Sequence, residues 1–137
     1  NKVRIEMDVP ADQTAWANKN LLIQVLINLL QNAIDALEKK TFHDEQPTIW
    51  IEGRKERGKS VLLIRDNGTG IEEQHLDKIF DPFYTTKDVG DGMGLGLSIV
   101  YRIIEKLEGR ISVRTEPGRF CEFALEFPEQ GSLEITA

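Results

Sequence analysis

Two asparagines in the segment QVLINLLQNAIDAL, Asn28 and Asn32, stand four residues apart and could bind a metal ion through their side-chain amides. If the segment is helical, the two side chains lie one turn apart on the same stripe of the helix. Amide oxygens that line a cleft suit a hard cation such as Mg²⁺, which keeps most of its water ligands. A solvated helix face would explain the same pattern, so the pair by itself leaves both interpretations open.

A second candidate is Asp66, which ends the apolar run SVLLIR and precedes the glycine-containing turn NGTGI. A carboxylate at this position could accept a hydrogen bond from an exocyclic amine, such as the amino group of a nucleobase. Gly68 and Gly70 carry no Cβ and would let the backbone approach a flat ligand closely. An ordinary Asp-Asn-Gly turn is the alternative, because these residue types are common in turns.

The segment GDGMGLGLS has glycine at every second position, Gly90, Gly92, Gly94 and Gly96, directly before a predicted helix. Backbone N–H groups at the start of a helix bind anions without net positive charge, so this segment predicts phosphate binding. No strand directly precedes the glycines, which excludes a Rossmann fingerprint, and no GK[ST] follows them, which excludes a Walker A loop. The neighbouring segment IFDPFYTTK adds two hydroxyls and the ammonium group of Lys87 near the same phosphates.

Hydrophobic patterning predicts the elements that must position these residues. Strands are expected over 3–9, 48–54, 60–65, 110–114 and 120–127, and helices over 19–40 and 95–107, with one helical turn over 74–79. Asn18 is the expected N-cap of the first helix, and Gly109 ends the second. The apolar arc of the first helix is so wide that we expect it to be buried on most sides.

Helices and closely spaced strands interleave, which predicts an α+β fold. The expected architecture is a two-layer α/β sandwich, with a mixed, mostly antiparallel sheet of about five strands covered by about three helices. A chain of 137 residues has the size of one domain, which we expect over 1–130, followed by a C-terminal tail over 131–137.

Composition narrows the classes of function. The chain has 17 basic and 23 acidic residues, a formal charge of −6, which disfavours non-specific nucleic-acid binding. The single Cys121 cannot form an internal disulfide. No apolar run approaches the roughly 20 residues of a membrane span and no signal-peptide pattern opens the chain, so no direct membrane contact is expected. The sequence begins at Asn1 without an initiator Met, which suggests a segment of a longer chain.

In this order and spacing, the four motifs resemble those of the catalytic ATP-binding domain of two-component sensor histidine kinases, which has the Bergerat fold. QVLINLLQNAIDAL resembles the family's asparagine box, DNGTGI its first glycine box, FDPFYTTK its phenylalanine box and GMGLGLSIV its second glycine box. The FYTTK form is similar to kinases of the nitrogen-regulation, dicarboxylate-sensing and oxygen-sensing type. The resemblance covers about residues 18–128, and the four boxes together are highly specific.

The resemblance implies that the chain binds ATP with Mg²⁺. Asp66 would read the adenine amino group, Asn32 would hold Mg²⁺, and Asn28 would help to order the metal and the phosphates. Lys87, in the lid, would be catalytic together with both asparagines. The nucleotide-binding positions implied in this sequence are Asn28, Asn32, Asp35, Ala36, Asp66, Gly68, Gly70, Ile71, Thr86, Lys87, Gly92, Gly94, Leu95, Gly96 and Leu97.

Two departures from the family pattern are visible. Many members carry glycine and threonine where this chain has Phe120 and Cys121, so a hydroxyl near the adenine is expected to be missing. Several members also place a lysine or arginine and a tyrosine at the positions of Asp35 and Ala36. Those contacts should be absent here, which gives Lys87 more weight.

The resemblance further implies transfer of the γ-phosphoryl group to a histidine on a separate dimerisation and phosphoacceptor domain, and from there to a response regulator receiver domain. His43 and His75 do not lie in a phosphoacceptor context, so the chain is not expected to phosphorylate itself. It should be monomeric, because dimerisation in this family comes from helices absent here. A cytoplasmic location is implied, in a parent kinase that can be anchored in the inner membrane.

Three other functions remain to be weighed. ATPases of the same superfamily, of the gyrase and mismatch-repair type, carry a glutamate as general base one turn before the metal-binding asparagine. Asn28 occupies that turn here, and an amide cannot accept a proton at neutral pH. Serine kinases of the anti-sigma type share the fold without the FDPFY segment. The third alternative is a degenerate docking module that binds no nucleotide.

Overall fold

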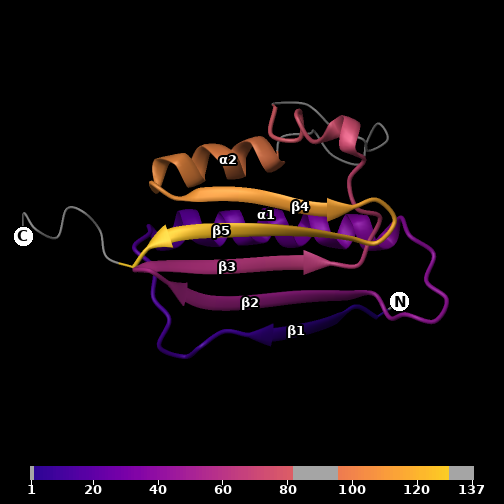
Figure 1. Cartoon of the computed structure of the whole chain (residues 1–137), viewed down its shortest axis with the longest axis horizontal. Coiled ribbons are helices and arrows are strands. Elements are labelled where there is room, and N and C mark those ends of the chain that lie inside the picture. Colours follow the sequence, from indigo (N-terminus) through magenta and orange to yellow (C-terminus); the bar gives the residue numbers. More distant parts are fainter. Residues whose placement is uncertain (1, 82–95, 130–137) are drawn as a thin grey trace, which may run out of the picture.

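A computed structural model describes residues 2–81 and 96–129 of the chain (Figure 1). Its elements are β1 (Arg4–Asp8), α1 (Lys19–Glu38), β2 (Thr48–Glu56), β3 (Lys59–Asp66), the 3₁₀-helix η1 (Glu73–His75), α2 (Gly96–Lys106), β4 (Arg110–Glu116) and β5 (Phe120–Pro128). The strands form one sheet in the order β1-β2-β3-β5-β4. β1 is parallel to β2, and the other neighbouring pairs are antiparallel.

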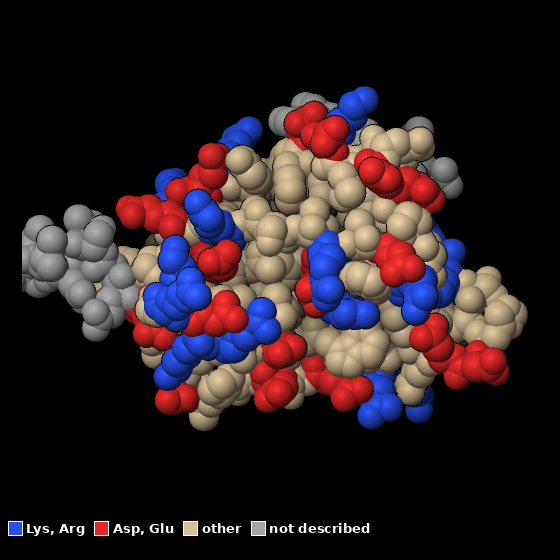
Figure 2. All heavy atoms as spheres, viewed as in Figure 1, with Lys and Arg blue, Asp and Glu red and all other residues tan. Residues whose placement is uncertain are grey.

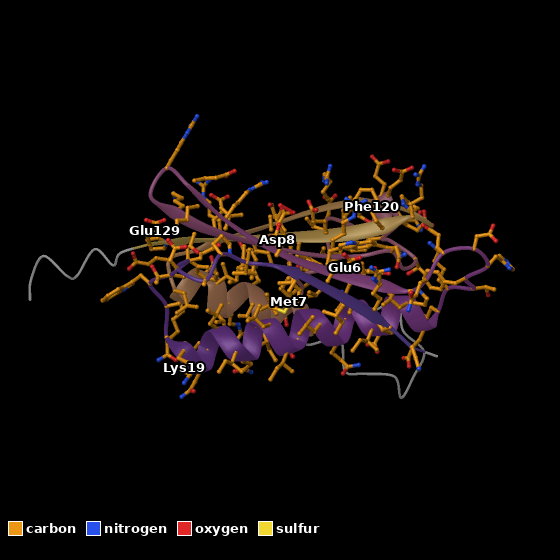
Figure 3. All side chains as sticks on the ribbon, turned by 90° about the horizontal axis from the view of Figure 1, so that it is seen from below. Glu6, Met7, Asp8, Lys19, Phe120 and Glu129 are labelled. Atoms are coloured by element: carbon orange, nitrogen blue, oxygen red, sulfur yellow. The ribbon has the colours of Figure 1, made fainter. Side chains whose placement is uncertain are left out.

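Both α-helices lie on one face of the sheet (Figures 1 and 3), which confirms the predicted α+β sandwich. The expected number of about three helices is wrong for the described residues, which contain two α-helices and η1. The turn expected over 74–79 forms successive i→i+3 hydrogen bonds, as from His75 to Glu72 and from Lys78 to His75, so it does not become an α-helix.

The core lies between α1, α2 and the alternating inward residues of the strands. Its most buried members are Val25, Leu29, Ala33, Leu37, Ile49, Ile64, Val100, Ile104, Cys121, Phe123, Leu125 and Phe127. α1 begins at its predicted N-cap, because the side chain of Asn18 accepts a hydrogen bond from the N–H of Leu21 (3.1 Å). Along β5, fully buried residues alternate with half-buried ones, so one face of this strand packs against the helices.

α1 is long and apolar enough, by length and hydropathy alone, to cross a membrane. The expectation that no segment reaches this threshold is therefore wrong. In the fold, α1 buries Val25, Leu29, Ala33 and Leu37 and packs against β3 and α2. α1 thus packs one face on the core, as a surface helix of a globular domain does, and Ile23 and Ile27 on its wide apolar arc stay exposed, so the expectation of burial on most sides is wrong.

The other face of the sheet carries no helix among the described residues, and acidic and basic side chains are intermixed over it (Figure 2). Arg65 stacks over the ring of Phe120, with 4.2 Å from the guanidinium carbon to the ring centroid. Glu122 lies within 4.0 Å of Arg65 and 3.2 Å of Arg114. Cation–π and ionic contacts thus link β3, β5 and β4 on this face.

Candidate functional site

The C-terminal half of α1 packs directly against the turn that follows β3. A Cβ added to Gly68 would lie 2.8 Å from the backbone carbonyl carbon and from the Cβ of Ala36, and 2.8 Å from a carboxylate oxygen of Asp66. Any side chain at position 68 would therefore push the turn away from the helix. The asparagine-containing helix and the turn DNGTGI, far apart in the sequence, meet at this contact.

Asp66 is the buried charge at the centre of this contact. Asp66 is the last residue of β3 and is only 3% exposed. One of its carboxylate oxygens accepts a 2.8 Å hydrogen bond from the N–H of Gly68. Burial raises the pKa of Asp66 from 3.8 to about 6, although that hydrogen bond and the charges of Lys40 and Arg65 act in the opposite direction. A desolvated carboxylate gains stability from any further hydrogen-bond donor, including one on a ligand.

A polar stripe on α1 leads away from this carboxylate. Asn28, Asn32 and Ala36 follow one another at intervals of four residues, so they lie on one line along the helix. Asn28 is about 12 Å along the axis from Ala36, at 1.5 Å per residue. Both asparagines are half-buried. Asp35 lies beside the stripe and accepts a 3.0 Å hydrogen bond from the side-chain amide of Gln31.

The second half of the turn is fixed to the β4–β5 hairpin. Gly70 has a φ of +68°, and a Cβ at this position would overlap the carbonyl oxygen of Glu116. The N–H of Ile71 donates to the hydroxyl of Thr115 (2.9 Å), which in turn donates to the carbonyl of Phe120 (2.7 Å). Gly70 and Ile71, both predicted as ligand contacts, are thereby held between the site and the hairpin.

Thr115 is a site residue that the sequence reasoning missed. It lies opposite Cys121 on β5, which lies opposite Asp66 on β3, so a hydroxyl, a thiol and a carboxylate occupy one row across three strands. Burial, with a contribution from the Asp66 charge, raises the pKa of Cys121 to about 12 and keeps the thiol neutral. The Thr115 hydroxyl is engaged within the protein, between the N–H of Ile71 and the carbonyl of Phe120. The sequence signal for Thr115 was its alternation with Ile111 and Val113, which puts the three side chains on one face of β4.

Asn67, in the same turn, has a structural role. Its side-chain oxygen accepts from the N–H of Thr48 (2.8 Å), and its side-chain amide donates to the carbonyl of Gln46 (3.0 Å). Its own carbonyl accepts from the ammonium group of Lys40 (2.9 Å). Lys40 is thus used to close the turn, and α1 ends at Glu38 rather than at Lys40 as predicted.

α2 borders the same region from the other side. Its described part begins at the exposed Gly96, where a Cβ would meet none of the described atoms within 4 Å, while Leu97 packs on the core. Phe80 anchors the chain before position 82, because its ring lies 5.4 Å from that of Tyr101 and 6.5 Å from that of Phe123. The predicted residues Thr86, Lys87, Gly92, Gly94 and Leu95 lie outside the described residues.

Other places in the described part of the chain offer less chemistry. A hollow of about 440 Å³ lies at the N-terminal end of α1, between Trp16, Lys106 and Pro128, and none of the predicted site residues lines it. Within residues 2–81 and 96–129, no group of three or more His, Cys, Asp or Glu side chains is placed to hold a metal ion. Amide oxygens, such as that of Asn32, would have to share a cation with the oxygens of a ligand.

The fold and the contact of Gly68 with Ala36 define a class of protein. Its members are two-layer sandwiches in which a long helix aligns polar side chains with a buried carboxylate at the end of a strand. The chain belongs to the histidine kinase-, DNA gyrase B-, and HSP90-like ATPase family, whose model (HATPase_c) matches residues 17–131. The family predicted from the four motifs is thereby confirmed.

The chain is similar to sensor kinases of known name. It is 37% identical over 113 residues to the C4-dicarboxylate transport sensor protein DctB of Pseudomonas aeruginosa, covering 81% of this chain and 18% of that protein. It is 40% identical over 114 residues to the sensor histidine kinase ZraS of Salmonella typhi, covering 82% of this chain and 23% of that protein. The chain therefore spans about a fifth of the length of these relatives.

Solved structures agree with this placement. The catalytic domain of the histidine kinase ThkA, in a nucleotide-free form, superposes with a TM-score of 0.78 at 31% identity, over 94% of this chain and 82% of that one. Full-length ShkA in complex with AMPPNP superposes with a TM-score of 0.77 at 27% identity, over 95% of this chain and 27% of that one. Of these two neighbours, ThkA is named as a histidine kinase.

The two sides of the glycine turn can be tested separately. Gly70→Ala should destabilise the chain by about 3 kcal/mol, because alanine is strained at positive φ and its Cβ would also displace the β4–β5 hairpin. Gly58→Ala is the matched control: its φ is +78°, no described atom lies within 4 Å of the added Cβ, and a cost of only about 1 kcal/mol is expected. Urea unfolding measures both, and equal losses would contradict the close approach at Gly70.

The raised pKa of Asp66 makes stability depend on pH. Between the ordinary pKa of 3.8 and the folded value of about 6, the folded state binds more protons, so this carboxyl destabilises the fold as pH rises through that window. Asp66→Asn keeps an acceptor for Gly68 but cannot ionise. Its stability relative to the original chain should therefore increase by about 2 kcal/mol between pH 4.5 and 7.5. Unfolding curves at several pH values test this, and a pH-independent difference would contradict it.

Proposed function

We propose that this chain binds Mg·ATP and presents its γ-phosphoryl group to a histidine on a separate helical phosphoacceptor domain. The observation that carries the proposal is the contact of Gly68 with Ala36, which sets the buried Asp66 in line with Asn32 and Asn28 on α1. This line has a hydrogen-bond acceptor for a base at one end and amide oxygens for a metal and phosphates further along.

At the adenine end, the proposal assigns Asp66 as the acceptor for the exocyclic amine. The small residues Gly68 and Ala36 leave only backbone and one methyl group beside the carboxylate, which suits a flat ring. Gly70 and Ile71 form the adjoining wall, held by Thr115. Binding would add a donor to a carboxylate that is already desolvated, so the gain is larger than at an exposed site.

At the phosphate end, the proposal assigns Asn32 as the metal ligand and Asn28 as its neighbour one turn earlier. Mg²⁺, when bound, would neutralise charge on the phosphates. The backbone N–H groups at the start of α2, near Gly96 and Leu97, are suited to phosphate oxygens. Thr86, Lys87, Gly92, Gly94 and Leu95 complete the proposed set from the resemblance of the motifs alone, and Asp35 is the polar neighbour beside the stripe.

In this mechanism the chain orients the nucleotide and stabilises charge on its phosphates, and the nucleophilic histidine comes from the separate phosphoacceptor domain. Phosphoryl transfer needs in-line positioning and charge stabilisation more than covalent participation by the protein. Asp66 fixes the base, Asn32 and Asn28 fix the phosphates, and Lys87 is assigned to the developing charge. A receiver domain of a response regulator is the proposed downstream partner, and the proposed location is cytoplasmic, since the relatives are named as sensor kinases.

Nucleotide binding is the first test. Calorimetry should show binding of ATP and ADP that strengthens with Mg²⁺. Asp66→Ala should weaken it about 10–100-fold, because a hydrogen bond to a charged acceptor is lost. Asn32→Ala should reduce the difference between titrations with Mg²⁺ and with chelator. Asn20→Ala, an exposed asparagine elsewhere on α1, is the matched control and should bind normally. No heat with Mg·ATP would overturn the proposal in favour of a docking module, and an unchanged Asp66→Ala curve would contradict the assignment of Asp66 to the adenine.

The kinase assignment over a water-directed ATPase depends on Asn28. A glutamate one turn before Asn32 could act as general base for water, whereas an amide cannot. Asn28→Glu should therefore raise ATP hydrolysis by about tenfold or more, since general bases contribute about 10²–10⁴-fold. Asn28→Gln has a similar size without a titratable group and should show no gain. Equal hydrolysis by the two variants would contradict this reading of position 28.

A further inference from the structure

The sheet has an open edge at β1 with an unusual amount of exposed apolar surface. In the strand order β1-β2-β3-β5-β4, β1 is paired on one side only among the described residues. Its inward-facing residues Ile5 and Met7 are 58% and 68% exposed. The register of Ile5 with Ile49 and of Met7 with Ile51 puts both on the helix side of the sheet.

α1 adds to this surface instead of covering it. Ile23 and Ile27, one turn apart, are 43% and 60% exposed. Figure 3 shows Met7 on the α1 side of β1 and Glu6 and Asp8 on the other side. We call the four exposed apolar side chains, Ile5 and Met7 of β1 and Ile23 and Ile27 of α1, the edge patch. A second macromolecule could cover this exposed apolar surface.

The charges along β1 are self-complementary. The sequence from Lys2 to Asp8 reads KVRIEMD, with basic residues before Ile5 and acidic residues after it. If a second copy runs antiparallel with Ile5 opposite Ile5, Arg4 lies opposite Glu6 and Lys2 lies opposite Asp8, in both directions. Cross-strand pairs of opposite charge stabilise antiparallel strands. On the helix side, the same register sets Val3 opposite Met7.

Neighbouring registers pair fewer opposite charges. A shift that sets Glu6 opposite Glu6, or Arg4 opposite Arg4, brings like charges together on the symmetry axis. Registers in which the two-fold axis falls between two residues are excluded by the direction of the backbone N–H and C=O groups. The N–H of Arg4 donates to the carbonyl of Pro47 beside β2 (2.9 Å), so alternate residues, Ile5 and Met7, direct their backbone groups toward the open edge. The register centred on Ile5 pairs these groups with each other.

We propose that β1 is a self-association edge, at which two copies of this chain pair antiparallel about a two-fold axis at Ile5. The pairing joins two sheets into one and brings the two edge patches together on the helix side. It satisfies backbone groups that an edge strand otherwise leaves to water. This proposal differs from the expectation of a monomer, which considered only the helices outside this chain, and it does not depend on the proposed function.

The opposite edge of the sheet, β4, does not share these features. Ile111 and Val113 on its helix side are only half-exposed, and α2 packs against the strand. In a pairing centred on Val113, Ser112 would face Arg114, so only the outermost charges would match. β1 is therefore the edge at which apolar exposure and charge pattern agree.

Association should be concentration-dependent and weak, because a strand pair with a small patch is below the size of a stable interface. Sedimentation velocity, in a series reaching millimolar protein, should show a monomer–dimer equilibrium that weakens with salt. Arg4→Glu and Glu6→Arg should each weaken it about tenfold or more, because each creates two like-charge pairs in the symmetric dimer. Arg110→Glu on β4 is the matched control and should leave the equilibrium unchanged.

Mixing the two variants provides the decisive test. Arg4 and Glu6 form an ion pair within one chain (3.2 Å), and each single variant loses it. In a mixed dimer, however, every cross-strand pair is again of opposite charge. The Arg4→Glu and Glu6→Arg variants, mixed, should therefore form heterodimers at least as tightly as the original chain self-associates, as measured by native mass spectrometry. A monomer at every concentration, or a mixture no tighter than either variant alone, would overturn the proposal.

Discussion

The site depends on two small residues where α1 meets the end of β3. Gly68 leaves no room for a Cβ beside Ala36, and Ala36 carries only a methyl group. With larger residues, the turn and the helix would separate, and Asp66 would no longer stand in line with Asn32. The close packing here thus depends on the absence of a side chain at position 68.

Burial of Asp66 costs stability, and the surrounding structure offsets it. The carboxylate keeps one backbone donor and lies within the fields of Lys40 and Arg65, yet its pKa remains raised. Asn67 and Thr115 hold the two flanks of the turn through hydrogen bonds to the loop before β2 and to the β4–β5 hairpin. These bonds keep the carboxylate from moving outward to water, which would relieve the desolvation. A rigid, unfavourably placed acceptor is preorganised for a donor supplied by a ligand.

The local patterns in the sequence predicted most of the elements but few of the contacts between them. Period-2 and period-3.6 patterns located the five strands and both α-helices, because burial of one face is encoded locally. The parallel pairing of β1 with β2 and the row from Thr115 to Asp66 depend on strand order, which no local pattern carries. The prediction of a third helix was wrong because residues 74–79 form i→i+3 hydrogen bonds. The predicted end of α1 at Lys40 was wrong because the side chain of Lys40 bonds to the carbonyl of Asn67.

The candidate site and the edge patch lie on the same, helix-covered side of the sheet but at different strands. Asp66 lies on β3, and two strand spacings, about 10 Å, separate that strand from β1. The asparagine stripe and the edge patch lie on different flanks of α1, since Ile23 and Ile27 are five residues, or about 140° around the helix, from Asn28 and Asn32 respectively. A charge change on β1 therefore alters neither the carboxylate nor the stripe directly. Coupling between association and nucleotide binding would have to pass through rigid movement of α1, whose buried face packs on β3 and α2 and resists it.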